Sequence, residues 1–301
     1  MTTDVTTRPT TTVGASGRAA VRPRASGRRA RDLLVVVPAL AILLVIVFPV
    51  LWMVFTSLRP STALAAKVPV GEYLHGLGFG AYQRLFADSD FGRYLANSLL
   101  VSVASTACTV VLACLAAYGL SRYRFRLRGS ILMVVLATQL LPFVVLITPM
   151  YIALGELGLL DSYVGLTLVY VAMTLPLAIY LTLSYFNTIP LALDEAARID
   201  GCSTVGVIFR VIVPVALPGI STVVITTFIA TWEEYFFSSV LMTSNDHKTV
   251  QVGLSSFFGE YASDWGMIMA AATVATVPTI VLFSLAQKRL VAGMAAGSVK
   301  E

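Results

Sequence analysis

The sequence predicts an all-α polytopic membrane protein with six transmembrane helices and a cytoplasmic helix–turn–helix element. Three observations support this fold class. Hydrophobic residues make up 57% of the 301 residues and charged residues only 12%, which lies outside the averages for soluble domains. The mean hydropathy is +0.83. Six long apolar runs alternate with short polar segments, and an apolar run of about 20 residues crosses the hydrocarbon layer as a helix.

The first 31 residues precede these runs and contain seven of the seventeen arginines. They are rich in Thr, Arg, Gly and Ala and lack apolar periodicity, so we expect a disordered, basic cytoplasmic tail. The net charge of +5 owes much to this tail, where membrane proteins often carry the charge that sets their topology. We therefore expect a lipid bilayer, and no nucleic acid, as the partner of this charge.

The predicted membrane domain covers residues 32–290 and leaves 291–301 as a cytoplasmic C-terminal tail. The first apolar run is about 25 residues long, whereas the apolar part of a signal peptide has roughly 7 to 15, so we expect it to be retained as a helix. Apart from Glu233 and Glu234, the first five runs contain no charged residue. The six spans are predicted at about 33–57, 96–120, 130–154, 164–186, 214–242 and 267–287.

The basic residues predict the orientation. Arg122, Arg124, Arg126 and Arg128 crowd the loop after the second run, on the same side as the N-terminal tail if the spans alternate. The positive-inside rule makes that side cytoplasmic, with both termini inside. The loop 59–94 then lies outside, where it forms either a cap of small helices or a plain connector.

A charged stretch, "LALDEAARIDG", interrupts the apolar chain between the fourth and fifth runs, within an element predicted at 190–213. Pro190 suits a first helical position, Asp194 and Arg198 are four residues apart, and Gly201 can provide a left-handed cap. Ser203 or Thr204 can then begin a second helix. Two interpretations follow: a linker at the membrane surface, or a surface that docks to a cytosolic partner. The excess of acidic residues on the cytoplasmic side favours docking.

The segment "EAARIDGCSTVGVIFRVIVPVALPG", residues 195–219, resembles the EAA signature of binding-protein-dependent ABC importer permeases. Only Cys202 departs from the usual pattern. The stretches "AAYGLSRYRF", "QLLPFVVLITPMY", "ATWEEYFFSSVLM" and "RLVAGMAAGSVK" look like carbohydrate-type permeases. The whole chain is similar to the smaller, six-span permease subunit of maltose-type importers, and would lie in a bacterial inner membrane.

The resemblance implies that the charged element couples this chain to a separate ATPase. The implied partners are two cytosolic ATP-binding subunits, which use ATP and Mg, a second homologous permease, an external solute-binding protein and a sugar. We expect no cofactor bound directly and no enzymatic activity, because none of the four lysines follows a glycine as a P-loop requires. The residues implied to dock to the ATPase are Glu195, Ala196, Ala197, Arg198, Asp200, Gly201 and Phe209.

Four residues of the fifth run, Trp232, Glu233, Glu234 and Tyr235, are candidates for an outer gate or translocation path, because carboxylates in a membrane segment are costly. An interfacial pair of acids with aromatic anchors is the alternative. Two other function classes remain: a proton-coupled secondary carrier that uses Glu233 and Glu234 as its proton site, and a membrane scaffold without transport.

Overall fold

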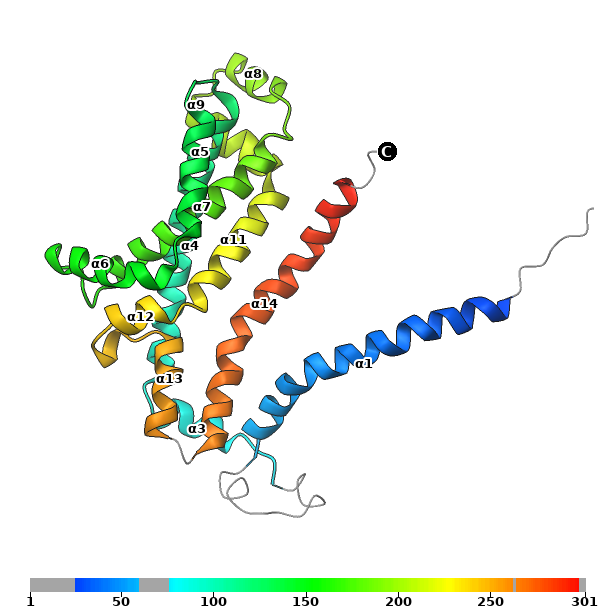
Figure 1. The fold of residues 1–301 in the computed structure, drawn as a ribbon, viewed down its shortest axis with the longest axis vertical. Helices are drawn as coiled ribbons and strands as arrows, with labels where there is room; N and C mark the ends of the chain where they lie inside the picture. Colours follow the sequence, from blue (N-terminus) through cyan, green and yellow to red (C-terminus); the bar gives the residue numbers. More distant parts are fainter. Residues whose placement is uncertain (1–24, 60–75, 262–263, 298–301) are drawn as a thin grey trace, which may run out of the picture. The chain divides into compact units, whose positions relative to one another are not determined.

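The computed structural model describes residues 25–59, 76–261 and 264–297 (Figure 1), and helices are the only regular secondary structure in these ranges. The chain divides into two units, Met1–Leu51 and Trp52–Glu301. The boundary between them falls inside the first helix. The functional residues discussed below all lie in the second unit.

The first helix, α1, spans Ala25–Ser57 and therefore begins before the predicted start of the first span. Residues 25–31, which we expected to be disordered, are helical. Alanine and arginine are good helix formers, and adding residues to an existing helix avoids the unfavourable nucleation step. The apolar part, Leu34–Ser57, is long enough to cross a membrane. The rest of the predicted tail, residues 1–24, lies outside the described residues.

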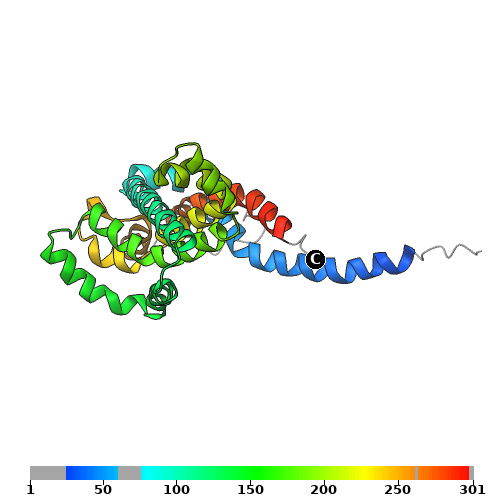
Figure 2. The ribbon, with the colours of Figure 1, turned by 90° about the horizontal axis from the view of Figure 1, so that it is seen from above.

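Three helices form the central bundle: α4 (Phe91–Arg122), α7 (Tyr163–Phe186) and α11 (Leu217–Trp232) pack side by side (Figures 1 and 2). α4 and α7 agree with the predicted second and fourth spans. Ala113 and Ala117 of α4 are fully buried, and such small residues let helix backbones approach closely.

The third predicted span is not one straight helix. α5 (Arg128–Ala137) and η2 (Thr138–Leu140) are separated from α6 (Phe143–Glu156) by a bend of 99° (Figure 1). The bend falls at Leu141, which is extended with ψ 129°, because a residue before proline is disfavoured in the helical conformation and Pro142 lacks an amide hydrogen.

The fifth predicted span, 214–242, is interrupted twice. The segment Thr204–Val215 meets α11 at an angle of 89°, and the chain leaves helical conformation again after Trp232, before α12 (Phe236–Leu241). The sixth span corresponds to α14 (Trp265–Gly297), whose apolar part ends at Leu285. By length and composition, four described helices can cross a membrane, or up to six if each bent pair counts as one span.

Small elements gather at the end of the bundle opposite α8: α3 (Gly80–Ala87), η4 (Asn245–His247) and α13 (Val250–Glu260) (Figure 1). α3 is tied down by the Arg84–Asp264 ion pair of 2.9 Å and by a 2.7 Å hydrogen bond between the Tyr82 and Ser57 hydroxyls. The described part of the loop 59–94 is therefore a folded element and not a plain connector. Residues 60–75 of that loop lie outside the described ranges.

Candidate functional site

Two short helices joined by a turn lie within residues 190–213, at one end of the bundle (Figure 1). α8 spans Ala192–Ile199 and α9 spans Thr204–Gly206. Pro190 lies before α8 and not at its first position. The hydroxyl of Ser203 accepts a 3.2 Å hydrogen bond from the last amide of α9, which confirms one of the two residues expected to begin the second helix.

A complete C-terminal cap ends α8. Gly201 has a φ of +82°, and its amide donates to the carbonyl of Arg198 at 3.1 Å. The next amide, of Cys202, donates to the carbonyl of Ala197 at 3.0 Å. This pair of bonds defines the Schellman motif, which needs a left-handed residue where Gly201 stands. The predicted glycine cap is thus confirmed.

The acidic residue nearest the start of α8 points into the protein. The Asp194 carboxylate lies 3.0 Å from Nε of Arg122, the last residue of α4, and the two side chains are only 7% and 6% exposed. Arg198 instead donates to the Tyr118 hydroxyl at 3.5 Å. The expectation that Asp194 and Arg198 support each other along the helix is therefore wrong, because Asp194 faces the bundle.

Most of the predicted docking residues are exposed. Ala197 is the exception: it is buried at 6% exposure and packs into the hydrophobic core of the helical bundle. Two neighbouring apolar residues, Ile199 at 86% and Val205 at 60%, are strongly exposed. The predicted docking residues that are exposed are Glu195, Ala196, Arg198, Asp200, Gly201 and Phe209.

The segment after α9 leads into α11 through an unusual helical turn. Val207–Ile212 is a π-helix, in which the Val213 amide donates to the carbonyl of Ile208. Pro214 follows, and it has no amide to continue an ordinary helix. Pro218 then stands in the first turn of α11, where proline is favoured. The two prolines thus bracket the 89° bend.

At the other end of α11, Trp232 has different surroundings from the other three predicted path residues. Trp232 is 2% exposed, stacks on Phe228 and donates its indole N–H to the Ala275 carbonyl of α14 at 3.0 Å. It is a packing residue in the contact between α11 and α14. Glu233, which ends α11, and Tyr235 are exposed. The structure thus separates Trp232 from Glu233, Glu234 and Tyr235, which line one surface pocket together.

Glu234 is occupied by bonds within the protein. Its carboxylate accepts hydrogen bonds from the amides of Phe237 at 2.8 Å and Ser238 at 3.1 Å, the first amides of α12. It also accepts one from the Tyr170 hydroxyl of α7 at 2.9 Å. A carboxylate at a helix N-terminus satisfies amides that have no partner within the helix. Glu234 therefore fixes the break between α11 and α12 and ties it to α7.

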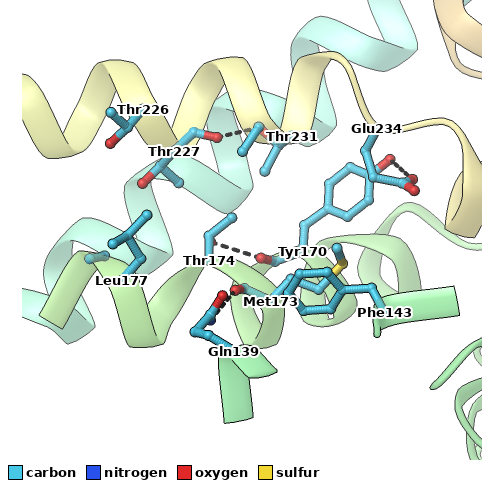
Figure 3. Close-up of a pocket in the computed structure, with 12 residues that line it drawn as sticks. Gln139, Phe143, Tyr170, Met173, Thr174, Leu177, Thr226, Thr227, Thr231 and Glu234 are labelled. Atoms are coloured by element: carbon cyan, nitrogen blue, oxygen red, sulfur yellow. Dashed lines mark hydrogen bonds between the residues drawn. The ribbon is translucent and has the colours of Figure 1, made fainter. Parts of the chain in front are cut away.

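A groove opens beside this carboxylate, between η2, α6, α7 and α11 (Figure 3). Its empty volume of about 570 Å³ includes space that is open to the surroundings. Apolar side chains form most of the wall of the groove. The Gln139 side chain donates a hydrogen bond to the Met173 carbonyl at 3.1 Å. The polar residues that line the groove are Gln139, Tyr170, Thr174, Thr226, Thr227, Thr231 and Glu234.

Sequence reasoning missed the polar residues of this groove other than Glu234. A signal was present, because Thr226, Thr227 and Thr231 stand at helical spacing within an apolar run. Gln139 carries the same signal in the third run. The facing side chains of α7 had no local signal, since they reach the groove only through helix packing.

Comparison with known proteins places these features in a family. A family model described as "Binding-protein-dependent transport system inner membrane component" matches residues 109–296. The sulfoquinovosyl glycerol transport system permease SmoH of Agrobacterium fabrum is 36% identical, with 84% of this chain and 88% of that protein covered. The trehalose/maltose permease MalG of Thermococcus litoralis is 33% identical over 90% and 97%. The trehalose permease SugB of Mycobacterium tuberculosis is 35% identical over 84% and 92%.

Two solved structures share the fold. A chain of a bacterial ABC transporter for the acidic polysaccharide alginate aligns with a TM-score of 0.74 at 22% identity, covering 89% of this chain and 99% of that one. A chain of an alginate transporter in complex with its pentasaccharide-bound periplasmic protein aligns with a TM-score of 0.61 at 17% identity, covering 87% and 96%. Because the family model covers more than half of the chain, this chain belongs to the inner-membrane components of binding-protein-dependent transport systems, the permease subunits of ABC transporters.

Proposed function

We propose that this chain is one of two permease subunits in an ATP-driven importer for a sugar or sugar-derived solute. A cytosolic ATPase binds the exposed face of α8 and its following turn, an external solute-binding protein delivers the solute, and the groove beside Glu234 forms part of the path. In this proposal six spans cross a bacterial inner membrane with both termini in the cytoplasm. ATP and Mg belong to the two ATPase subunits.

The observation that carries the proposal is the two-sided construction of α8. One side is held to the permease by Asp194 and Ala197, while Ile199 remains 86% exposed between charged residues. Val205 and Phe209 expose further apolar surface within the same short element. Exposed apolar residues rimmed by charges are typical of a protein interface, and this surface lies in the segment that carries the EAA signature.

The docking surface can be tested by co-purification. The cognate ATPase is co-expressed with wild-type permease and with Ile199→Glu, and the ATPase retained in detergent is quantified. A charge in the centre of an interface is expected to reduce retention by about tenfold or more. Leu157→Glu, at an exposed leucine beyond α6, is the matched control. Full retention by the Ile199 variant, or equal loss in both variants, would reject the assignment.

The substrate class follows from relatives and from the groove. Three relatives are named for the transport of sulfoquinovosyl glycerol, trehalose/maltose or trehalose, and a fourth for the uptake of diacetylchitobiose. The groove offers apolar surface from Phe143, Met173 and Leu177, interrupted by hydroxyl and amide groups (Figure 3). A sugar presents the complementary pattern, with C–H faces between hydroxyls.

A hydroxyl deletion tests the path. Thr227→Val removes a polar group from the groove at nearly constant volume, and one such hydrogen bond contributes about 0.5 to 1.5 kcal/mol, or roughly a two- to tenfold effect. We expect solute uptake, measured with saturating loaded binding protein, to change by this factor while ATPase retention stays normal. Ser184→Ala, at an exposed hydroxyl that bonds its own helix, is the control. Unchanged uptake in the Thr227 variant would remove this groove from the path.

The proton-carrier alternative receives no comparable support. Both oxygens of the Glu234 carboxylate are engaged with α12, and one also accepts from Tyr170, an arrangement that serves helix capping. Glu233 is exposed at the end of α11. Membership in the permease family also favours an ATP-driven mechanism. Uptake that persists without the ATPase but collapses with the proton gradient would reverse this preference.

A further inference from the structure

The buried pair Asp194–Arg122 stands apart from the exposed docking surface. Its two charged groups are 3.0 Å apart and more than nine-tenths buried. Arg122 also donates to the carbonyl of Phe186, the last residue of α7, at 3.2 Å, and to Ser121 at 3.3 Å. One guanidinium therefore joins the end of α4, the end of α7 and the start of α8.

Packing alone did not require these charges. Replacing a buried ion pair by apolar residues of similar volume is often neutral or stabilising, because both charges lose hydration. What an ion pair adds is an electrostatic contact with a defined partner. Asp194 sits one helical turn from Ala197, which is also buried against the bundle, so α8 is anchored along its inner face.

The covalent connections of α8 make the anchor mechanically important. Residues 187–191 lead to it from α7 without forming a helix. On its other side, the glycine turn, the π-helix and the 89° bend separate it from α11. A force applied to the exposed face of α8 reaches α11 through these bends, whereas the ion pair offers a direct route to the ends of α4 and α7.

We propose that Asp194 and Arg122 are positioning residues that transmit the movement of the docked ATPase to α4 and α7. This inference rests on the proposed function, because it assumes that α8 binds the ATPase. Without the pair, α8 would still bind the ATPase. It would, however, move relative to α4 and α7, and the groove between α7 and α11 would not follow the movement of the ATPase. The ATPase would then hydrolyse ATP, but less solute would be transported for each ATP hydrolysed.

The test uses the complete importer in proteoliposomes, with ATPase retention, ATP hydrolysis and solute uptake measured on the same preparation. For Asp194→Asn we expect normal retention and continued hydrolysis, but solute moved per ATP reduced by about tenfold. The exchanged pair Asp194→Arg/Arg122→Asp should recover part of the coupling. The apolar pair Asp194→Leu/Arg122→Met should retain the fold and thermal stability without recovering coupling. Arg126→Gln, which removes an exposed arginine nearby, is the control and should behave as wild type.

Each outcome separates the inference from the proposed function. If the wild-type chain fails to retain the ATPase, the proposed function itself fails. If the wild type couples but Asp194→Asn moves as much solute per ATP, only the transmission role fails. The role also fails if retention and uptake fall in parallel, or if the apolar pair couples normally, because the pair would then serve only to shape or stabilise α8.

Discussion

Substitutions at Gly201 should affect ATPase binding through backbone conformation alone. This residue has a φ of +82°, yet a Cβ placed on it would have no atom within 4 Å. Within the described residues, a side chain at Gly201 would therefore clash with no neighbour. The free-energy cost of a substitution comes from the left-handed backbone conformation. That cost is about 1 to 2 kcal/mol for an ordinary L-residue and smaller for asparagine.

We expect the affinity for the ATPase to decrease from the wild type to Gly201→Asn, then to Gly201→Ala, and to be lowest for Gly201→Val. A penalty of about 1 to 2 kcal/mol on the docking-competent turn corresponds to roughly a 5- to 30-fold loss, and a β-branched residue is worse in this conformation. Affinity is measured by titrating purified ATPase onto permease in lipid nanodiscs, at matched levels of inserted protein.

Gly158 supplies a matched control. It has a φ of +67° and equally open space at its Cβ, but it lies beyond α6, away from the docking element. Gly158→Ala should therefore cost similar folding free energy without weakening ATPase binding. If Gly201→Val binds as tightly as Gly201→Asn, or if Gly158→Ala weakens binding equally, the turn conformation does not control docking.

Two further predictions concern the stability of the permease alone. Gly219→Ala would make a Cβ clash with the ring of Tyr185, and it should lower the free energy of unfolding by about 1 to 3 kcal/mol because α7 and α11 would be forced apart. Thermal unfolding in detergent should show this loss, and Tyr185→Ala in the same chain should relieve it. Gly119→Ala, whose Cβ would meet no atom within 4 Å, is the control and should be neutral or stabilising. Asp161→Asn should abolish a loss of stability that the wild type shows in acid. Partial burial raises the pKa of the Asp161 carboxyl, but hydrogen bonds from Ser244, His247 and Thr243 outweigh the effect of burial and lower the pKa overall. Because the folded-state pKa lies below the unfolded value of about 3.9, the stabilisation is present above that pH and disappears as pH falls through the folded pKa. An unfolding curve of the Asn variant that keeps the same pH dependence below pH 4 would contradict this role.

The sequence was most informative where periodicity and local chemistry decide the structure. The second and fourth spans, the Gly201 cap and the Ser203 start of α9 all depend on neighbouring residues, and all four are present. Helix existence and cap chemistry are local properties.

Pairings between distant segments could not be predicted in the same way. Asp194 was placed beside Arg198 because the two are one turn apart, yet its partner Arg122 comes from another helix. Arg122 itself looked like one of four topological charges in a loop. The sequence likewise predicts Trp232 as part of a gate, yet its indole donates a hydrogen bond to α14. Only the packing of the helices selects among several chemically acceptable partners.

The two predicted spans that are broken in the structure both have a break beside the same groove. One breaks just before Phe143 and the other just before Glu234, and both residues line the groove. A broken helix exposes backbone polar groups, which hydrocarbon does not tolerate unless protein or a water-filled cavity satisfies them. At the second break, the Glu234 carboxylate satisfies amides of α12. Two breaks beside one groove are the arrangement expected of the path that we propose, and substitutions of the groove residues, Glu234 included, should change which solute passes.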